Sequence, residues 1–222
     1  MRSNLRLVVF DLDGTLVECV SSWVYVHEHF GVSNEGSLRE YQQGLIDDEE
    51  FMRRDIALWK RCKPGIGLEE IERILAGVQI TEGAHALFHA LRAAKVQTAI
   101  ISGGLMPLAR RVAGALGIDH VMANDLAVHS NGTLVGHGVL QVELHRKGLP
   151  MRRLMSRLKM TGEECAAVGN SYIDVPMLGM AGLGIAFCPL DDEVRRAADI
   201  VVEERDLSLL APFLIDRNHG RR

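Results

Sequence analysis

Apolar residues are spaced with two different periods along the chain, and the period changes from segment to segment. Short runs rich in apolar residues, typical of buried strands, occur at residues 7–10, 96–101, 120–123, 166–168, 184–187 and 200–202. Between most of these runs, apolar side chains recur at helical spacing, as in Ala84, Leu87, Phe88 and Leu91. Strand and helix segments thus alternate, which predicts an α/β fold with a doubly wound parallel sheet.

Two segments interrupt this alternation. Residues 19–80 contain no strand signal but three stretches of helical periodicity. We expect a small α-helical cap domain there, inserted into a core domain of residues 1–18 and 81–222, although these helices could instead be members of the main domain. Within residues 126–140, Asn131-Gly132 lies between two β-forming pairs and predicts a β-hairpin excursion.

Composition and charge narrow the classes of protein to consider. The 222 residues carry a formal net charge of −4 with both signs interspersed, so we expect no nucleic-acid or membrane partner, despite a short basic tail at residues 217–222. No window approaches the roughly 18 apolar residues of a membrane helix. The first strand lies near the N-terminus and the four cysteines are scattered, which predicts no cleavable signal, reduced thiols and a cytoplasmic location. We expect a monomer or a homodimer.

Two carboxylates follow the first predicted strand directly. Asp11 and Asp13 are two residues apart, so their side chains can face the same space beyond the carboxyl end of the strand. Paired oxygen ligands suit a hard cation such as Mg2+, and a carboxylate can also attack phosphorus. A plain Asp-rich turn remains open at this point, whereas an EF-hand is disfavoured because Leu16 stands where an oxygen ligand is needed.

Polar residues also follow two later predicted strands. Ser102-Gly103-Gly104 ends the second strand, and Asn170 and Asp174 follow the strand at 166–168. The carboxyl ends of parallel strands share one edge, so we expect these residues to converge with the first carboxylate pair. The serine and glycines can bind a phosphate or simply cap a helix. Lys147 is expected at the start of a helix, where the positive end of the helix dipole does not favour a cation. A bound anion would explain a lysine at this position. The alternative is a lysine that is simply solvated.

These residues together resemble a known family. The four motifs of the haloacid dehalogenase (HAD) superfamily of phosphatases are similar, in order and spacing, to DLDGT at 11–15, ISGG at 101–104, Lys147-Gly148 and GNSYIDVPML at 169–178. Other stretches, including TEGAHALFHAL, GIAFCP and ADIVVEERDL, resemble the phosphoserine phosphatase branch. The resemblance implies a HAD-like Rossmannoid core with a helical cap of the C1 type. It also implies a Mg2+-dependent hydrolase of a small phosphorylated metabolite, possibly phosphoserine.

The resemblance assigns a role to each motif residue. Asp11 would be the nucleophile, forming an aspartyl phosphate, and also a metal ligand. Asp13 would be the general acid and base, with its backbone carbonyl on Mg2+. Ser102 and Gly103 would bind the phosphoryl oxygens, whose charge Lys147 would neutralise. These roles fit phosphoryl transfer, which requires positioning and charge neutralisation.

The metal shell would be completed by Asn170 and Asp174. The family motif usually has an acid at the first of these positions, and the amide of Asn170 keeps an oxygen but removes one negative charge. We therefore expect weaker Mg2+ binding, with more reliance on Asp174.

The cap departs further from the phosphoserine phosphatase pattern. The Glu that contacts the amino group of phosphoserine in that branch falls on Val20, with Glu18 two residues earlier. The Arg that holds the carboxylate falls on or next to Asp55, preceded by Arg54. Loss of these charged partners would weaken selection for a zwitterionic substrate. Two alternatives stay open: phosphoryl transfer to an alcohol acceptor, and a phosphometabolite-binding module that has lost catalysis.

Overall fold

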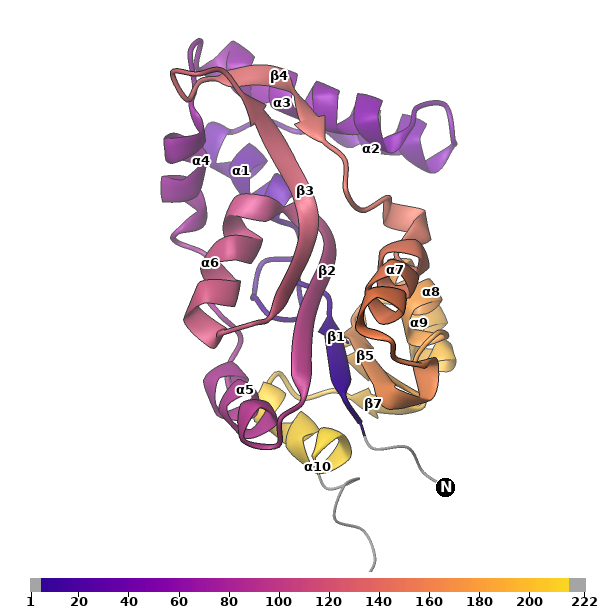
Figure 1. The fold of residues 1–222 in the computed structure, drawn as a ribbon. Helices are drawn as coiled ribbons and strands as arrows, with labels where there is room; N and C mark the ends of the chain where they lie inside the picture. Colours follow the sequence, from indigo (N-terminus) through magenta and orange to yellow (C-terminus); the bar gives the residue numbers. More distant parts are fainter. Residues whose placement is uncertain (1–4, 216–222) are drawn as a thin grey trace, which may run out of the picture.

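The protein is described by a computed structural model that covers residues 5–215, so the basic tail at 217–222 lies outside the described residues. Its centre is a seven-stranded sheet with the order β4-β3-β2-β1-β5-β6-β7 (Figure 1). Only the pair β3 and β4 is antiparallel among the described strands. The strands are β1 (Leu7–Phe10), β2 (Gln97–Leu105), β3 (His120–Val128), β4 (Leu134–Val139), β5 (Cys165–Gly169), β6 (Leu183–Phe187) and β7 (Ile200–Val202).

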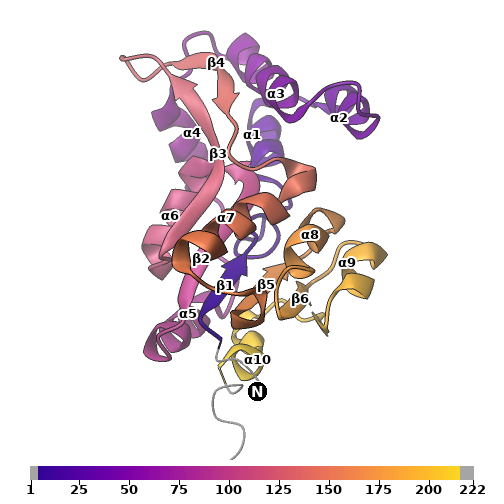
Figure 2. The ribbon, with the colours of Figure 1, turned by 45° about the vertical axis from the view of Figure 1, so that its right-hand side comes forward.

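Helices cover both faces of the sheet, as expected for a doubly wound fold. Val8 and Phe10 of β1 belong to one apolar cluster, and Leu7 and Val9 belong to the other. The first cluster includes side chains of α5, α6 and α10, and the second includes those of α7, α8 and α9. Figure 2 shows how these helices are arranged around the sheet. The helices of these layers are α5 (Ala84–Ala93), α6 (Met106–Leu116), α7 (Gly148–Leu158), α8 (Val175–Leu178), α9 (Asp192–Ala197) and α10 (Ala211–Leu214).

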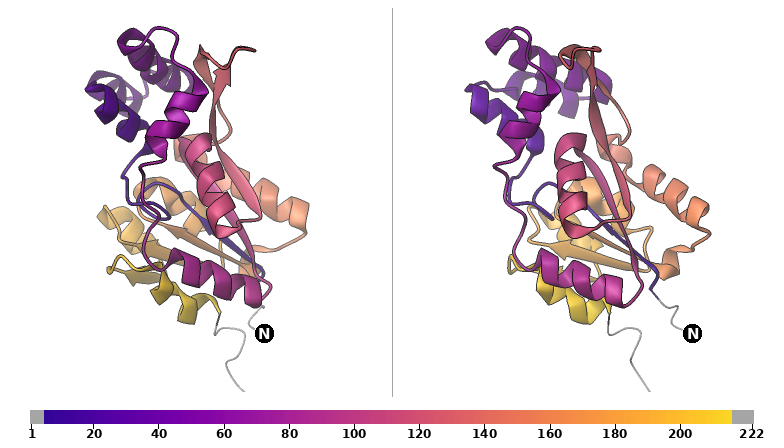
Figure 3. Two further views of the ribbon diagram at one scale, coloured as in Figure 1. Left: turned by 90° about the vertical axis from the view of Figure 1, so that its left-hand side faces the viewer. Right: turned by 60° about the vertical axis from the view of Figure 1, so that its left-hand side comes forward.

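Four further helices lie between β1 and β2 in the sequence, and residues 19–80 contain no strand. They are α1 (Ser22–Phe30), α2 (Glu35–Gln42), α3 (Asp48–Cys62) and α4 (Leu68–Leu75). These helices stand beyond the carboxyl ends of the strands, next to the outer part of the β3–β4 hairpin (Figure 3). Lys60 joins the two parts, because its Nζ donates to the backbone oxygens of Leu134 at 2.9 Å and Val135 at 2.8 Å. The division into two domains stays a prediction.

Two strands are longer than the sequence pattern predicts. The second was expected to end before Ser102, but β2 continues to Leu105 with a register shift against β3 between Ile101 and Leu105. The short strand at 120–123 and the first arm of the hairpin form a single strand, β3. The hairpin itself lies where it was predicted, with Gly132 at φ +81° in its turn.

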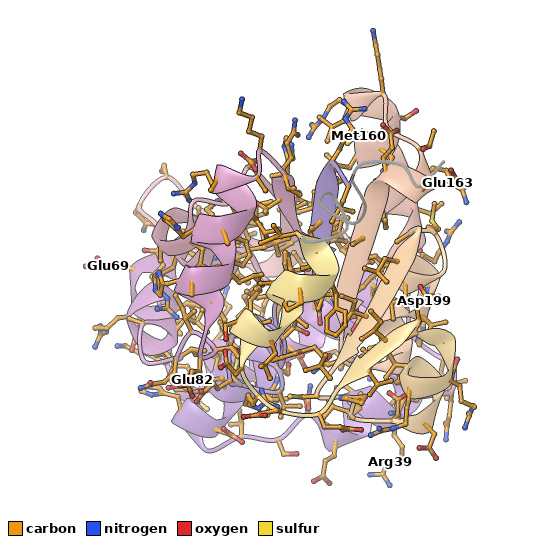
Figure 4. The ribbon with its side chains drawn as sticks, turned by 90° about the horizontal axis from the view of Figure 1, so that it is seen from below. Arg39, Glu69, Glu82, Met160, Glu163 and Asp199 are labelled. Atoms are coloured by element: carbon orange, nitrogen blue, oxygen red, sulfur yellow. The ribbon has the colours of Figure 1, made fainter. Side chains whose placement is uncertain are left out.

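The opposite end of the sheet is closed by loops that lead into the strands. Met160, Glu163 and Asp199 lie at this end (Figure 4), and the carboxylate of Asp199 accepts from the backbone N–H of Gly184 at 2.7 Å. Within residues 5–215, no helix combines the length and the apolar character needed to cross a bilayer.

Candidate active site

A buried lysine joins two carboxylates at the carboxyl edge of the sheet. Asp11 follows β1, and its backbone N–H donates to the oxygen of Val168 in β5 at 2.9 Å. Lys147 precedes α7, and its Nζ lies 2.7 Å from Asp11 Oδ1 and 2.7 Å from Asp174 Oδ1. All three side chains are buried. The solvated-lysine alternative is therefore wrong, and Lys147 meets anions as the helix-start argument predicted.

Burial and charge shift the protonation of this cluster. Desolvation raises the pKa of Asp11 to about 6, with a further rise from Asp174 and a partly opposing effect of Lys147. Burial alone would lower the pKa of Lys147, but its ion pairs with Asp11 and Asp174 outweigh this effect and raise the pKa above its ordinary value. Lys147 therefore stays cationic in the cluster.

Asp13 is held by the first residue of α1. Ser22 donates to Asp13 Oδ2 from both its backbone N–H and its hydroxyl, each at 2.8 Å. The Ser22 hydroxyl oxygen in turn accepts from the backbone N–H of Leu105 at 2.9 Å. Desolvation raises the pKa of Asp13 to about 7, because it outweighs the hydrogen bonds of Ser22. A carboxyl group with such a pKa can both give and accept a proton near neutrality.

Gly104 makes room for this arrangement. A Cβ on Gly104 would lie 2.6 Å from Asp13 Oδ2 and 2.8 Å from the Ser22 hydroxyl oxygen, so only glycine fits here. The preceding Ser102 is buried, and its hydroxyl oxygen accepts from the N–H of Gly104 at 3.1 Å. The backbone oxygen of Gly103 accepts from Trp23 Nε1 at 3.1 Å and from Asn124 Nδ2 at 3.2 Å. The conformation of the Ser-Gly-Gly segment is thus fixed by hydrogen bonds from several elements.

The loop after β5 brings Asn170 and Asp174 to the same edge. Asp174 Oδ2 accepts from the backbone N–H groups of Asn170 at 2.9 Å and Ser171 at 3.1 Å. The Asn170 side chain is buried, its Nδ2 has no partner among the described residues, and it packs against Gly14, where a Cβ would lie 2.1 Å from that nitrogen. Gly14 also has a φ of +73°, which favours glycine in the turn after β1.

The available metal donors are hard oxygen atoms. Asp11 and Asp174 could offer two carboxylates, Asn170 an amide oxygen and Asp13 a backbone carbonyl, although in this structure both Asp174 oxygens are engaged by Lys147 and by backbone N–H groups. Within the described part of the chain, no group of three or more His, Cys, Asp or Glu side chains is arranged to hold a metal ion. Two carboxylates with neutral oxygens fit Mg2+, which usually takes one or two carboxylates and keeps other ligands from water or substrate. The set does not suit a soft metal.

A cavity of about 270 Å3 opens over these residues, a size suited to a small metabolite. It brings together six of the predicted motif residues, Asp11, Asp13, Ser102, Gly103, Lys147 and Asn170. Asp174 does not line the cavity, because it lies fully buried behind Lys147. The remaining wall comes mainly from the cap helices and two loops: Val20, Ser21, Trp23, Val24, Asn34, Leu38, Asp48, Phe51, Met52, Asp55, Gly104, Asn124, Leu144, Ser171, Ile173 and Leu190.

The four predicted cap residues divide into two pairs. Val20 and Asp55 line the cavity, Val20 as an exposed residue and Asp55 as a buried one. Glu18 is exposed and lines a different hollow, so its placement does not support a substrate contact. Arg54 is also outside the cavity, because its guanidinium pairs with Glu40 and Glu50 on the other side of α3. Neighbouring residues of a helix do not share a face, and here it is Asp55 that faces inward.

Several supporting residues were not predicted. Ser22 was missed because the Ser21-Ser22 pair indicates only a helix N-cap, a role that Ser21 indeed takes by accepting from the N–H of Val24. Asn34 follows no motif, and nothing in the sequence identifies it. Asn124 has a usable signal, since it is a polar residue inside an apolar stretch and buried polar residues need specific partners.

Comparison with known proteins agrees with this geometry. The sequence model of the haloacid dehalogenase-like hydrolase family matches residues 8–179. A phosphoserine phosphatase of Lactococcus lactis is 31% identical over 212 residues, covering 94% of each chain. One of Archaeoglobus fulgidus is 32% identical over 213 residues, and this chain spans 60% of its length.

A solved structure is similar as well. The phospho-aspartyl intermediate analogue of a phosphoserine phosphatase is matched with a TM-score of 0.79 and 26% identity, over 96% of this chain and 100% of that one. The predicted HAD-like α/β fold is therefore confirmed. The chain belongs to the haloacid dehalogenase-like hydrolase family, and its similarity to phosphoserine phosphatases extends over nearly the whole sequence.

Proposed function

We propose that this protein is a Mg2+-dependent phosphomonoester hydrolase that acts on a small phosphorylated metabolite through an aspartyl phosphate on Asp11. One observation carries the proposal: Lys147 Nζ lies 2.7 Å from Asp11 in the same cavity that Asp13 and Ser102 line. This arrangement supports the proposal, because a nucleophile, a counter-charge and a proton donor would then surround one space large enough for a phosphoryl group. The names of the relatives and of the solved structure are consistent with it.

In the first step, a carboxylate oxygen of Asp11 attacks phosphorus, and the bond from phosphorus to the alcohol oxygen breaks. The phosphoryl oxygens carry the charge of the transition state. Lys147 neutralises this charge, and Ser102 binds the oxygens. Asp13 gives its proton to the departing alcohol oxygen. Its raised pKa of about 7 supports this role, because a substantial fraction is then protonated near neutral pH.

In the second step, the deprotonated Asp13 takes a proton from water, and the water oxygen attacks phosphorus. The bond to Asp11 breaks, and inorganic phosphate and the free Asp11 carboxylate result. The two hydrogen bonds from Ser22 hold Asp13 Oδ2, which leaves Oδ1 for the proton transfers apart from a long 3.9 Å contact with Cys19 Sγ. One positioned carboxyl group thus serves both half-reactions.

Asp11, Asp174, Asn170 and the backbone carbonyl of Asp13 are the groups that would hold Mg2+. When bound, the ion supplies charge neutralisation at the phosphoryl group and allows Asp11 to be ionised. Among the described residues, Lys147 is the cation paired with Asp11 and Asp174, and burial together with Asp174 still raises the pKa of Asp11, which supports a need for more positive charge. Asn170 contributes oxygen without charge, and we therefore expect a modest affinity for Mg2+.

The proposal is tested with p-nitrophenyl phosphate. We expect Mg2+-dependent release of phosphate, complete loss of turnover in Asp11→Asn, and unchanged turnover in Asp192→Asn, a matched change of an exposed aspartate. After acid quenching with phosphorus-labelled substrate, the label should lie on the peptide that contains Asp11. If the wild-type protein binds phosphate but releases none from the ester, a binding module is favoured instead. Label on a residue other than Asp11 would refute the assigned nucleophile.

A further inference from the structure

The cap end of the cavity contains a buried carboxylate. Asp55 lies on the inner face of α3, has only 2% of its surface exposed, and lines the cavity that also holds Asp11 and Lys147. Both of its oxygens accept from Asn34 Nδ2, Oδ1 at 3.1 Å and Oδ2 at 3.2 Å. A carboxylate is rarely kept in such a place unless something pairs with it.

The protein partners of Asp55 are neutral. Trp59 Nε1, which can only donate, gives its hydrogen to His27 Nδ1 at 2.8 Å. Because His27 Nδ1 accepts, its remaining proton is on Nε2, and the imidazole is uncharged. Nε2 lies 3.3 Å from Asp55 Oδ2, close enough for an ion pair by distance but too poorly aligned for a hydrogen bond. His27 therefore orients toward Asp55 without cancelling its charge.

No Lys or Arg among residues 5–215 pairs with the carboxylate of Asp55. Among the described residues that line the cavity, Lys147 is the only Lys or Arg, and it is engaged by Asp11 and Asp174. The other cap acid on the cavity, Asp48, has its Oδ1 occupied by the Tyr41 hydroxyl at 3.1 Å and the N–H of Leu144 at 2.9 Å.

Aromatic rings form the adjoining wall. Trp23 lines the cavity and stacks on Trp59 with ring centroids 5.4 Å apart and an angle of 22° between the planes. Phe51 lines the cavity from α3. The face of an aromatic ring attracts a cation but not a carboxylate, and the attraction is strongest where water is excluded. Carboxylate and rings thus favour the same kind of ligand.

We infer that the cap end of the cavity selects a leaving group that carries an ammonium cation and no carboxylate, with Asp55 as the residue that determines this specificity. The inference rests on the proposed hydrolase activity and adds the class of substrate to it. A substrate carboxylate at this end would lie against Asp55 and would find no cation to pair with. An ammonium group would satisfy the buried charge that Asn34 and His27 leave uncompensated.

The test compares three phosphomonoesters of similar size with the wild-type protein. These are 2-aminoethyl phosphate, its neutral analogue n-propyl phosphate, and O-phospho-L-serine, which adds a carboxylate to the ammonium compound. We expect kcat/KM for 2-aminoethyl phosphate to exceed that for each of the others about tenfold or more, because an unpaired buried charge discriminates strongly. Equal values for the ammonium and neutral esters, or a preference for O-phospho-L-serine, would overturn the inference.

The variant Asp55→Asn tests the residue. It should reduce the preference for 2-aminoethyl over n-propyl phosphate to about twofold or less, since the charge is removed while the shape is kept. Turnover of p-nitrophenyl phosphate, which has no ammonium group, should change much less. Glu49→Gln is the matched control, because it removes a negative charge from the exposed side of α3 and should keep the wild-type preference.

The outcomes separate the two proposals. If p-nitrophenyl phosphate is not hydrolysed, the proposed function fails. If it is hydrolysed but Asp55→Asn keeps the full ammonium preference, only the assignment of Asp55 fails. If Asp55→Asn fails to fold, the comparison of the three esters with the wild-type protein decides the ammonium preference without any variant. Calorimetric binding of the same esters to Asp11→Asn gives a readout that does not depend on turnover.

Discussion

Asp13 carries both proton transfers in the proposed reaction, and its replacement by asparagine has a specific signature. Asp13→Asn keeps an oxygen that can accept from Ser22 but cannot give a proton, so turnover should fall about 10²- to 10⁴-fold. The loss should be larger for an alkyl phosphate than for p-nitrophenyl phosphate, whose leaving group needs little protonation. Inorganic phosphate should still bind in a titration. Equal losses for both esters would argue against the acid role.

Ser22 offers a second prediction at the residue scale. Ser22→Ala removes one of the two hydrogen bonds to Asp13 and leaves the N–H of Leu105 without its acceptor, so the free energy of unfolding should fall by about 1–3 kcal/mol. Because Asp13 is then less well positioned, kcat should fall about tenfold while KM changes little. Urea unfolding and steady-state kinetics measure the two effects, and the exposed Ser156→Ala should show neither.

The contrast between Asp13 and Ser22 shows what the sequence can reveal about single residues. Asp11 and Asp13 could be predicted because charged residues directly after an apolar strand are unusual and need a reason. The role of Ser22 could not be predicted, because it depends on contact with Leu105, a residue 83 positions away. Asp55 differs from Ser22, because it shares the helical spacing of the apolar residues Met52, Ile56 and Trp59, which assigns it to the buried face of α3.

At the scale of elements, the extent of β3 was underestimated for an identifiable reason. Asn124 interrupts the apolar pattern in the middle of the strand, and polar residues usually indicate a strand end. In the fold its Nδ2 donates to the oxygens of Gly103 and Val142, and its Oδ1 accepts from the N–H groups of Gln141 and Val142. These long-range hydrogen bonds satisfy the side chain inside the protein, and local sequence cannot predict them.

Helix α3 and strand β4 are joined by Lys60, which makes the attachment of the cap helices testable. Lys60→Met keeps the aliphatic stem but removes the hydrogen bonds to the oxygens of Leu134 and Val135. We expect faster amide hydrogen exchange in α3 and β4 and a loss of about 1 kcal/mol or more in stability. Lys63→Met is the control, because Lys63 pairs with Glu70 inside the cap region. Equal exchange in both variants would show that Lys60 does not fasten the two elements.

At the scale of the whole molecule, the sequence predicted that distant strand ends converge on one edge of the sheet, but it did not predict which residues form the opposite wall of the cavity. Parallel strands bring all carboxyl ends to one edge, so residues from β1, β2 and the loop after β5 had to converge once the sheet type was known. The cavity itself needs a second wall, and that wall comes from the cap helices and from Leu144. How helices pack across a sheet end depends on side-chain fit over the whole interface, which periodicity does not encode.

The carboxyl groups gathered at this edge of the sheet make the free energy of unfolding of the whole protein depend on pH. Without metal, the pKa of Asp11 is about 6 and that of Asp13 about 7, both above the ordinary 3.8 of the unfolded chain. The folded state therefore holds more protons than the unfolded state from about pH 4 to pH 6 at Asp11 and from about pH 4 to pH 7 at Asp13, so the free energy of unfolding should fall as pH rises through these ranges. Urea unfolding in EDTA from about pH 5 to pH 8 measures this fall in the free energy of unfolding. Asp13→Asn should make the fall smaller. Added Mg2+ should stabilise the folded protein at the alkaline end of the range and so oppose the fall. Parallel curves for the wild-type protein and Asp13→Asn would mean that Asp13 is ionised throughout and cannot supply the proton for the leaving alcohol.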